Sequence, residues 1–313
     1  MKIATSYKTD NPLLKGLADI GIEIMYYQNF ANIELQTLDK FDVWFGNLFS
    51  EIKYPRILIS IKKYLTKNKG IYVFWNRDAP WNCNLKFYRE WLIKYLNPID
   101  FYFTHSGQEN IPCQHKYYLA NAAANEYICP IEDSALDDES SYEYDISFYG
   151  SYKNTKNYGC YKRKKFLQQI EPYLKNKNYR IKFIDSQEIK LGISDQIELM
   201  KKTKINLNYG ATCDLKKVNS WGIPERVFGI PATGSFLLTD YRKNIKQTFL
   251  PGLCDYYLDI KDCIKKIDFY LNNFKYLRNR AITLQKNIID NHTYQHRAQQ
   301  FLQIIEKYFS KEY

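Results

Sequence analysis

The stretch WGIPERVFGIPATGSFLLTD, residues 221–240, carries the strongest fold signal in the sequence. Pro224 suits the first turn of a helix, because the N–H that proline lacks has no partner there. Ala232-Thr233-Gly234 then predicts a turn, and residues 235–240 predict a buried strand that ends at Asp240. A helix that leads through a turn into a buried strand is the repeating unit of a parallel α/β sheet.

The same alternation extends along the chain on both sides of this stretch. Apolar runs typical of buried parallel strands occur at 145–150, 179–185, 205–209 and 256–260, and in an earlier set at 2–7, 22–27, 42–47, 71–76 and 100–105. Segments with helical spacing separate the earlier runs and occupy residues 11–20, 56–67 and 86–95. We predict two Rossmann-like sheets in tandem, followed by helices at 262–273, 276–290 and 294–309.

The charge distribution gives a provisional division of the 313-residue chain into two domains. Residues 1–130 have a net charge of +3, residues 131–145 contain seven acids and no base, and residues 146–313 carry +15. We interpret 131–145 as an acidic linker between domains 1–130 and 146–290, with a helical tail at 291–313 that braces both. An acidic surface loop within one domain is the alternative.

Composition restricts the functional classes further. The net charge of +11 indicates an anionic partner, and nucleic acid, an acidic membrane surface and a phosphorylated substrate all satisfy it. The seven cysteines are scattered, with no pair at zinc-ligand spacing, so reduced thiols and no structural zinc are expected. The absence of an N-terminal apolar signal and of a 20-residue apolar run predicts a cytoplasmic protein, with contact at the inner face of a membrane left open.

Ligands of open α/β sheets bind beyond the carboxyl ends of strands, so we take the residues there as candidates. Gly150 and Ser151 follow one predicted strand, and their backbone amides could approach a phosphate closely. Asn208 ends the next and offers both a hydrogen-bond donor and an acceptor. Glu225 and Arg226 lie at the predicted start of a helix, where a carboxylate could accept from sugar hydroxyls and a guanidinium could bind a diphosphate.

One carboxylate of the first half is a candidate general base. Asp78 lies in WNRDAP, residues 75–80, directly after a predicted strand. Asp before Ala-Pro is also common in turns, so a purely structural role is the alternative. The sequence has no glycine-rich dinucleotide fingerprint.

Taken together, these segments resemble the spore-maturation (CgeB-like) glycosyltransferases, which are relatives of the group 1 glycosyltransferases with the GT-B fold. The segments are WNRDAP, FYFTHS, HKYYLANAA, DISFYGSY with Arg163, INLNYG, GIPERVFGIPATGSFLLTDY, FYLNN and HTYQHR. The resemblance implies two facing Rossmann-like domains, with the acceptor in the first, a nucleoside diphosphate sugar in the second, and no metal ion or other cofactor. It also implies donor-binding roles for Arg163, Thr233 and Gly234.

Two positions depart from that family pattern. Gly229 stands where the family usually has a Glu thought to hold the donor ribose, and Cys254 stands at a second acidic position. Glu225 lies one helical turn before Gly229, so we expect it to reach a hydroxyl in the space that the glycine leaves.

We therefore predict a metal-independent, hexosyltransferase-like enzyme that transfers a sugar to a hydroxyl of a glycan or other acceptor in surface-glycan synthesis. Arg163, Arg226 and the amides of Gly150 and Ser151 are expected to offset the charge of the diphosphate leaving group. A catalytically silent nucleotide-sugar-binding subunit is the second hypothesis. A nucleic-acid-binding protein is the third, and it is disfavoured because the aromatic residues lie mainly in apolar runs and no recognition module occurs.

Overall fold

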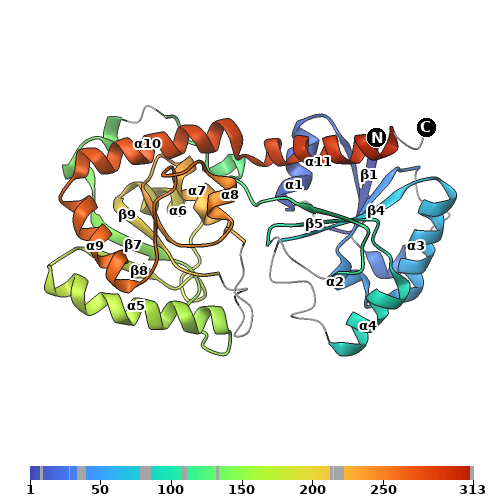
Figure 1. Ribbon diagram of the computed structural model, residues 1–313, viewed down its shortest axis with the longest axis horizontal. Coiled ribbons are helices and arrows are strands. Elements are labelled where there is room, and N and C mark those ends of the chain that lie inside the picture. The colour runs from blue at the N-terminus through green and yellow to red at the C-terminus, as the bar shows by residue number, and fades with distance from the viewer. Residues whose placement is uncertain are drawn as a thin grey trace. The chain divides into compact units, whose positions relative to one another are not determined.

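The chain folds into two compact units in a computed structural model (Figure 1). The structure describes residues 1–7, 10–27, 29–33, 40–77, 86–106, 111–131, 134–211, 214 and 222–310. The first unit combines Met1–Ala120 with Tyr294–Tyr313, and the second is the continuous segment Asn121–Thr293. Each unit is an α/β sheet with helices on its faces, so the predicted fold class is confirmed.

The first unit is built on a parallel sheet with the strand order β2-β1-β3-β4-β5-β6. Its strands are β1 (Lys2–Thr5), β2 (Glu23–Tyr26), β3 (Val43–Phe45), β4 (Ile71–Asn76), β5 (Phe101–Thr104) and β6 (His115–Tyr118). The central strands β3, β4 and β5 are buried throughout, as their continuous apolar sequences predict. β6 lies at the edge and alternates between partly buried and exposed residues.

Among the described residues of this unit, the sheet is accompanied by the helices α1 (Pro12–Asp19), α2 (Leu48–Glu51), α3 (Pro55–Lys67), α4 (Phe87–Leu96) and α11 (Tyr294–Phe309), and by the short 3₁₀ turn η1 (Phe30–Asn32). The Asn11 side chain caps α1 by accepting from the amide of Leu13 at 3.0 Å. α11 packs against α1 at Gly16, where a Cβ would lie 2.5 Å from the carbonyl oxygen of Tyr294. The last helix is therefore an integral part of the first unit.

The second unit is built on a parallel sheet with the strand order β11-β10-β9-β7-β8. Its strands are β7 (Tyr144–Tyr149), β8 (Ile181–Ile184), β9 (Thr203–Asn208), β10 (Leu237–Asp240) and β11 (Tyr256–Tyr257). β8 and β9 lie on opposite sides of β7, so the order of strands reverses beside β7. A ligand crevice is expected at the carboxyl edge of the sheet at this point.

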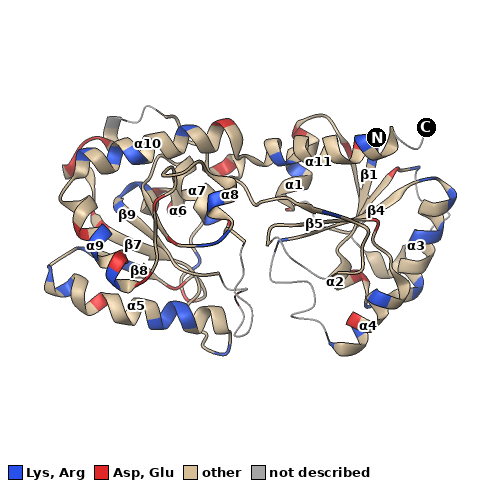
Figure 2. Ribbon diagram, viewed as in Figure 1, with Lys and Arg blue, Asp and Glu red and all other residues tan. Residues whose placement is uncertain are grey.

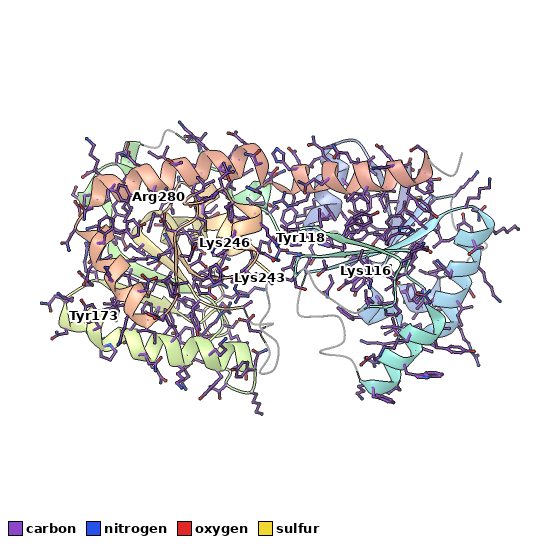
Figure 3. All side chains as sticks on the ribbon, in the orientation of Figure 1. Lys116, Tyr118, Tyr173, Lys243, Lys246 and Arg280 are labelled. Atoms are coloured by element: carbon purple, nitrogen blue, oxygen red, sulfur yellow. The ribbon has the colours of Figure 1, made fainter. Side chains whose placement is uncertain are left out.

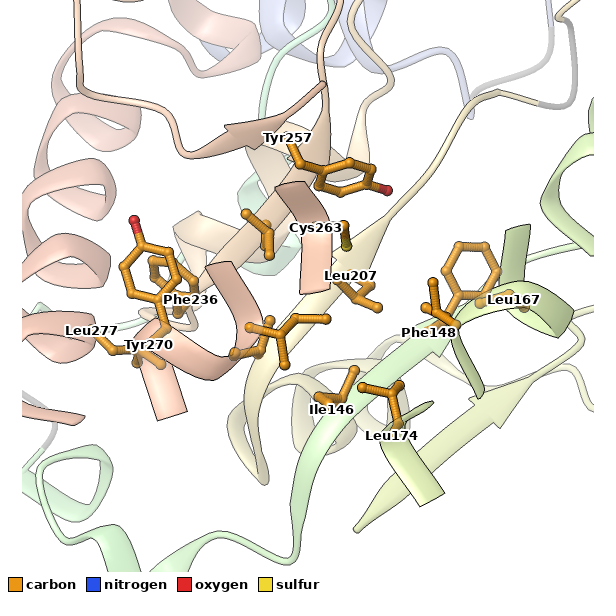
Figure 4. Close-up of a cluster of buried hydrophobic side chains, with 14 of the residues drawn as sticks. Ile146, Phe148, Leu167, Leu174, Leu207, Phe236, Tyr257, Cys263, Tyr270 and Leu277 are labelled. Carbon is orange, nitrogen blue, oxygen red and sulfur yellow. The ribbon is translucent and has the colours of Figure 1, made fainter. Parts of the chain in front are cut away.

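The helices of the second unit enclose its core. They are α5 (Tyr158–Asn176), α6 (Ile193–Lys201), α7 (Arg226–Ala232), α8 (Ile245–Thr248), α9 (Ile260–Leu271) and α10 (Phe274–Asn291), with 3₁₀ turns η3 (Asn125–Tyr127), η4 (Ser134–Leu136) and η5 (Glu139–Ser141). Figure 4 shows the core between strands and helices, where the rings of Phe236 and Tyr270 lie 4.5 Å apart. The predicted closing helices are confirmed as α9, α10 and α11.

The acidic stretch 131–145 belongs to the second unit, so its interpretation as an interdomain linker is wrong. Asp137 pairs with Arg278 on α10 at 3.2 Å, and Glu139 pairs with Lys204 on β9 at 2.7 Å. These ion pairs attach the stretch to the surface of the second unit. The alternative, an acidic surface segment within one domain, describes it correctly.

Candidate active site at the carboxyl edge of the second sheet

The candidate residues lie at the carboxyl ends of three neighbouring strands of the second sheet: Gly150 follows β7, Asn208 ends β9 and Asp240 ends β10. Because the strands are parallel, these ends meet at one edge. A pocket of about 790 Å³ opens beyond β9, β10 and β11. Its lining combines aromatic rings, acids and lysines: Lys162, Phe166, Tyr209, Asp214, Asp240, Tyr241, Arg242, Lys243, Tyr257, Leu258, Asp259, Ile260 and Lys261.

One wall of the pocket is a stack of aromatic rings. The ring of Phe166 is parallel to that of Tyr209 at 4.2 Å between centroids and to that of Tyr257 at 5.6 Å. Lys162 on α5 places its ammonium nitrogen 6.0 Å from the Tyr209 ring, and Lys243 lines the pocket beyond β10 (Figure 3). Flat rings beside ammonium groups can stack a planar ligand that carries negative charge.

Asn208, predicted from its place at the end of a strand, organises this edge from within. Its side chain is buried, and its Nδ2 donates to Thr239 Oγ1 at 2.9 Å and to Asp240 Oδ1 at 3.2 Å. Its backbone oxygen accepts from the Tyr257 hydroxyl at 2.7 Å. The residue thereby fixes Asp240 and the aromatic wall in place, and its own Oδ1 has no hydrogen-bond partner within the described part of the chain.

A buried ion pair that no sequence motif marks lines the pocket. Arg242 donates from Nη2 to Asp214 Oδ2 at 2.7 Å and from Nη1 to Asp214 Oδ1 at 3.2 Å. Its Nε lies 3.3 Å from Asp240 Oδ2. This two-point contact fixes Asp214, which lies between two undescribed segments, to the end of β10.

Arg163 lies at this edge, as predicted, but its guanidinium binds backbone. It donates to the carbonyl oxygens of Ser151 at 3.2 Å, Tyr209 at 2.9 Å and Gly210 at 3.0 Å. Burial lowers the pKa of Arg163. Arg163 therefore joins the loops that follow β7 and β9, where the strand order reverses, and the predicted direct contact with a diphosphate does not match its geometry.

Arg226 and Gly150 lie against each other at the same edge. Arg226 donates from Nη1 to the carbonyl oxygen of Tyr149 at 2.7 Å, and a Cβ on Gly150 would lie 2.8 Å from that Nη1. Burial lowers the pKa of Arg226, and the positive charge of Arg163 lowers it further. The amide of Gly150 itself donates to Ile184 O at 3.1 Å, so the glycine provides space for the guanidinium instead of the predicted phosphate-binding amide.

Asp185, at the end of β8, holds the loop that contains Ser151. It accepts from the amides of Tyr152 at 2.8 Å and Lys153 at 2.6 Å, and the hydroxyls of Ser151 and Ser186 lie 2.9 Å apart. Burial acts to raise the pKa of Asp185, but the amide hydrogen bonds outweigh it, and the pKa is lowered. These loop amides thus already bind a carboxylate of the protein.

Glu225 lies at the start of α7, as predicted, and its carbonyl accepts from the amide of Gly229 at 2.9 Å. The space over Gly229 is occupied, because a Cβ there would lie 3.7 Å from Cγ of the Tyr127 ring. The Tyr127 hydroxyl donates to Gln196 Oε1 at 2.9 Å. The expected empty space for Glu225 is therefore filled by an aromatic ring.

Thr233, Gly234 and Cys254 are not brought to the carboxyl edge. Thr233 and Gly234 precede β10, and Cys254 precedes β11, so all three lie toward the amino ends of parallel strands. The Thr233 hydroxyl donates to Ile230 O at 2.7 Å, and the carbonyl of Gly234 accepts from Arg278 at 2.7 Å. The predicted donor-binding role of this turn does not agree with its position, and an acid at position 254 would also lie away from the pocket.

The first unit has its own buried polar cluster at the carboxyl edge of its sheet. The Glu51 carboxylate is fully buried and accepts from the Ser6 hydroxyl, the Trp44 indole and the Tyr72 hydroxyl. Burial raises the pKa of Glu51 despite these hydrogen bonds. No sequence motif marked this residue, and the predicted base Asp78 lies outside the described residues.

A family model described as glycosyl transferase-like matches residues 141–303, which is more than half of the chain. The chain belongs to this glycosyl transferase-like family. The protein is a glycosyltransferase of the group 1 type, and the matched region contains the whole carboxyl edge of the second sheet. A comparison with curated protein sequences gives no match.

Solved structures show the fold of this glycosyltransferase independently. HepE from Anabaena in complex with UDP has a TM-score of 0.62 at 11% identity, and the match covers 98% of this chain and 100% of the HepE chain. An α-glucosyltransferase in complex with UDP and a 13-mer DNA has a TM-score of 0.61 at 11% identity, with 97% and 98% covered. Sucrose-phosphate synthase from Thermosynechococcus elongatus has a TM-score of 0.58 at 12% identity, with 99% and 100% covered. The GT-B class is thereby confirmed.

Proposed function

We propose that this glycosyltransferase binds a nucleoside diphosphate sugar at the carboxyl edge of its second sheet and transfers the sugar to an acceptor hydroxyl. The observation that carries the proposal is the Arg226 guanidinium, held against Gly150 at the point where the strand order reverses. A guanidinium there can offset the charge that develops on a diphosphate leaving group.

The neighbouring residues take supporting roles in this proposal. The aromatic wall with Lys162 would stack and neutralise part of the nucleotide, while Asp240, held in place by the buried Asn208, would orient its hydroxyls. Arg163 acts through the loops that it joins and is a positioning residue. Glu225 is the proposed acceptor of a hydrogen bond from a ribose or sugar hydroxyl, which would reach its carboxylate beside the Tyr127 ring.

UDP is the proposed nucleotide, because the similar structures include HepE solved with UDP and with UDP-glucose. We propose that transfer proceeds without a resident metal ion, with arginine supplying the positive charge. The described residues include no group of three or more His, Cys, Asp or Glu able to hold a metal.

Asp78 is the proposed general base, and a glycan of surface-glycan synthesis is the proposed acceptor. The spore-maturation (CgeB-like) subfamily is proposed from the motif of residues 222–241, from which Gly229 departs.

Binding is tested first by calorimetry with UDP, GDP, CDP and dTDP. UDP is expected to bind, Arg226→Ala to abolish that binding, and Arg180→Ala to leave it unchanged. Arg180 is a suitable control because it pairs with Asp145 at the amino ends of β7 and β8. Unchanged UDP affinity in Arg226→Ala would contradict the proposed site.

Catalysis is tested separately, since Gly229 under the Tyr127 ring also favours a silent subunit that binds nucleotide sugars without transfer. Release of UDP from UDP-sugars is measured with glycan acceptors and with DNA, because one similar structure contains DNA. Acceptor-dependent release that Asp78→Asn abolishes, with UDP affinity retained, supports the enzyme and its base. Tight UDP binding without release on any acceptor supports the silent subunit.

A further inference from the structure

Helix α4 of the first unit exposes a stripe of aromatic rings to solvent. Phe87 is 85% exposed, Tyr88 55%, Trp91 56% and Tyr95 72%. Residues 87, 91 and 95 are spaced by four, and Tyr88 lies three before Trp91, so all four rings lie along one side of the helix. Monomeric proteins rarely expose contiguous apolar patches of more than a few hundred Å², and larger ones usually mark interaction sites.

The opposite side of α4 has few contacts of its own with the core. Ile93 is its one fully buried residue, while Leu92 and Leu96 pack partly buried against the core cluster of the first unit. The rings of Trp91 and Tyr95 stack on each other at 5.2 Å and 8° between planes. Each of the four aromatic side chains of α4 is thus more exposed than buried.

Positive charge lies near this stripe, as the blue segments of α3 show (Figure 2). α3 and α4 together contain six Lys or Arg residues and one acid, Glu90, which already pairs with Lys94 at 2.8 Å. A groove of about 750 Å³ lies between the two helices, lined by apolar side chains of both and by Lys62, Lys63 and Lys67 of α3. Lys63 and Lys67 are exposed at its rim.

We propose that α4 and the lysine-bearing side of α3 form a docking surface for an anionic lipid bilayer. Tyr and Trp rings prefer the headgroup region, because each ring combines an apolar body with a polar atom. Lysines beside them attract anionic headgroups, and this combination is typical of helices that lie in the membrane interface. Every helix in the described parts of the chain is too short or too polar to span a bilayer, so attachment of this kind would be peripheral. The proposal does not depend on the donor site.

The test is co-sedimentation of the full chain with vesicles of phosphatidylcholine alone or mixed with phosphatidylglycerol. Binding to the anionic vesicles is expected, with weakening at high salt and a blue shift of tryptophan fluorescence that Trp91→Phe removes. Binding to both vesicle types alike, or to neither, would overturn the proposal.

Two variants separate the aromatic and charge contributions. The triple variant Phe87→Ser/Trp91→Ser/Tyr95→Ser is expected to abolish co-sedimentation with the anionic vesicles. The double variant Lys63→Gln/Lys67→Gln is expected to weaken partition onto these vesicles about 25-fold, because each lysine contributes about five-fold. The matched control is Phe269→Ser/Tyr276→Ser, which removes two rings of the second unit, each 49% exposed, and is expected to bind as the wild type does.

Other occupants of the stripe give different results. Loss of a dimer in the α4 variant, measured by light scattering, with vesicle binding retained, would assign the stripe to a second copy of the chain. Loss of affinity for a soluble glycan, again with vesicle binding retained, would assign it to the acceptor. Either result would refute the membrane assignment, and UDP affinity of the variant shows that the second unit is intact.

Discussion

Replacing Gly150 with alanine is expected to displace the Arg226 guanidinium and weaken donor binding without unfolding the second unit. The new Cβ would lie 2.8 Å from Nη1 and 2.9 Å from Nη2 of Arg226, closer than atoms can approach. The guanidinium is the far end of a flexible side chain, so it can move aside. The hydrogen bond from Nη1 to Tyr149 O, now 2.7 Å, would then be lost.

The size of the effect follows from the contacts involved. Losing one partly exposed hydrogen bond would lower the free energy of unfolding by about 1 kcal/mol. The φ of 159° at Gly150, which L side chains rarely adopt, adds backbone strain of about 1 to 3 kcal/mol. A diphosphate would lose a charge-assisted hydrogen bond of about 1.5 to 3 kcal/mol, which is about a 10- to 150-fold increase in Kd. Both the affinity for UDP and the free energy of unfolding should therefore fall, and only the loss of affinity should depend on the presence of Arg226.

Calorimetry with UDP on Gly150→Ala, Arg226→Ala and the double variant tests this mechanism. Because both substitutions act through one guanidinium, Gly150→Ala should have little further effect once Arg226 is removed. Gly192→Ala is the control, since its Cβ would lie 3.4 Å from the Asp195 carboxylate, an ordinary contact. Additive losses in the double variant, or an unchanged Kd in Gly150→Ala, would refute the reasoning.

Three further outcomes follow from the site. Arg163→Ala should lower the free energy of unfolding by about 3 to 5 kcal/mol in urea titrations, because it removes one buried and two partly buried hydrogen bonds of a charged group. Lys165→Ala on the exposed side of α5 should leave stability unchanged, and equal stabilities of the two variants would contradict the positioning role. Asp185→Asn should cost about 2 kcal/mol at neutral pH. Because the pKa of Asp185 is lowered in the folded state, its contribution to the free energy of unfolding is present above pH 3.8 and is lost as pH falls through the folded pKa. The difference in stability between the wild type and Asp185→Asn should therefore disappear in acid. A difference that stays constant with pH would contradict this role of Asp185. UDP affinity measured with EDTA and with Mg²⁺ should agree, and a loss of about tenfold in EDTA would contradict metal independence.

The sequence located most strands because buried parallel strands are nearly continuous in apolar residues. β4 was predicted with its observed bounds, Ile71–Asn76. β6 was missed because an edge strand alternates between buried and exposed residues and resembles a loop in composition. The acidic stretch 131–145 was misassigned because its partners, such as Arg278, are distant in sequence.

The candidate site was predicted well in location and less well in detail. The position of Asn208 and Arg226 at the carboxyl edge follows from the order of strands and helices. The same rule could have excluded Thr233 and Gly234, since they precede a parallel strand. Sequence could not show that Arg163 binds three carbonyl groups or that Tyr127 covers Gly229, because both depend on long-range packing.

The closure of the first unit by α11 has a consequence for synthesis of the protein. The first unit combines residues 1–120 with residues 294–313, while the second unit is the continuous segment between them. Domains generally fold as the chain emerges from the ribosome. Here the second unit is synthesised in full before α11, so it can fold while the first unit still lacks the helix that packs on Gly16.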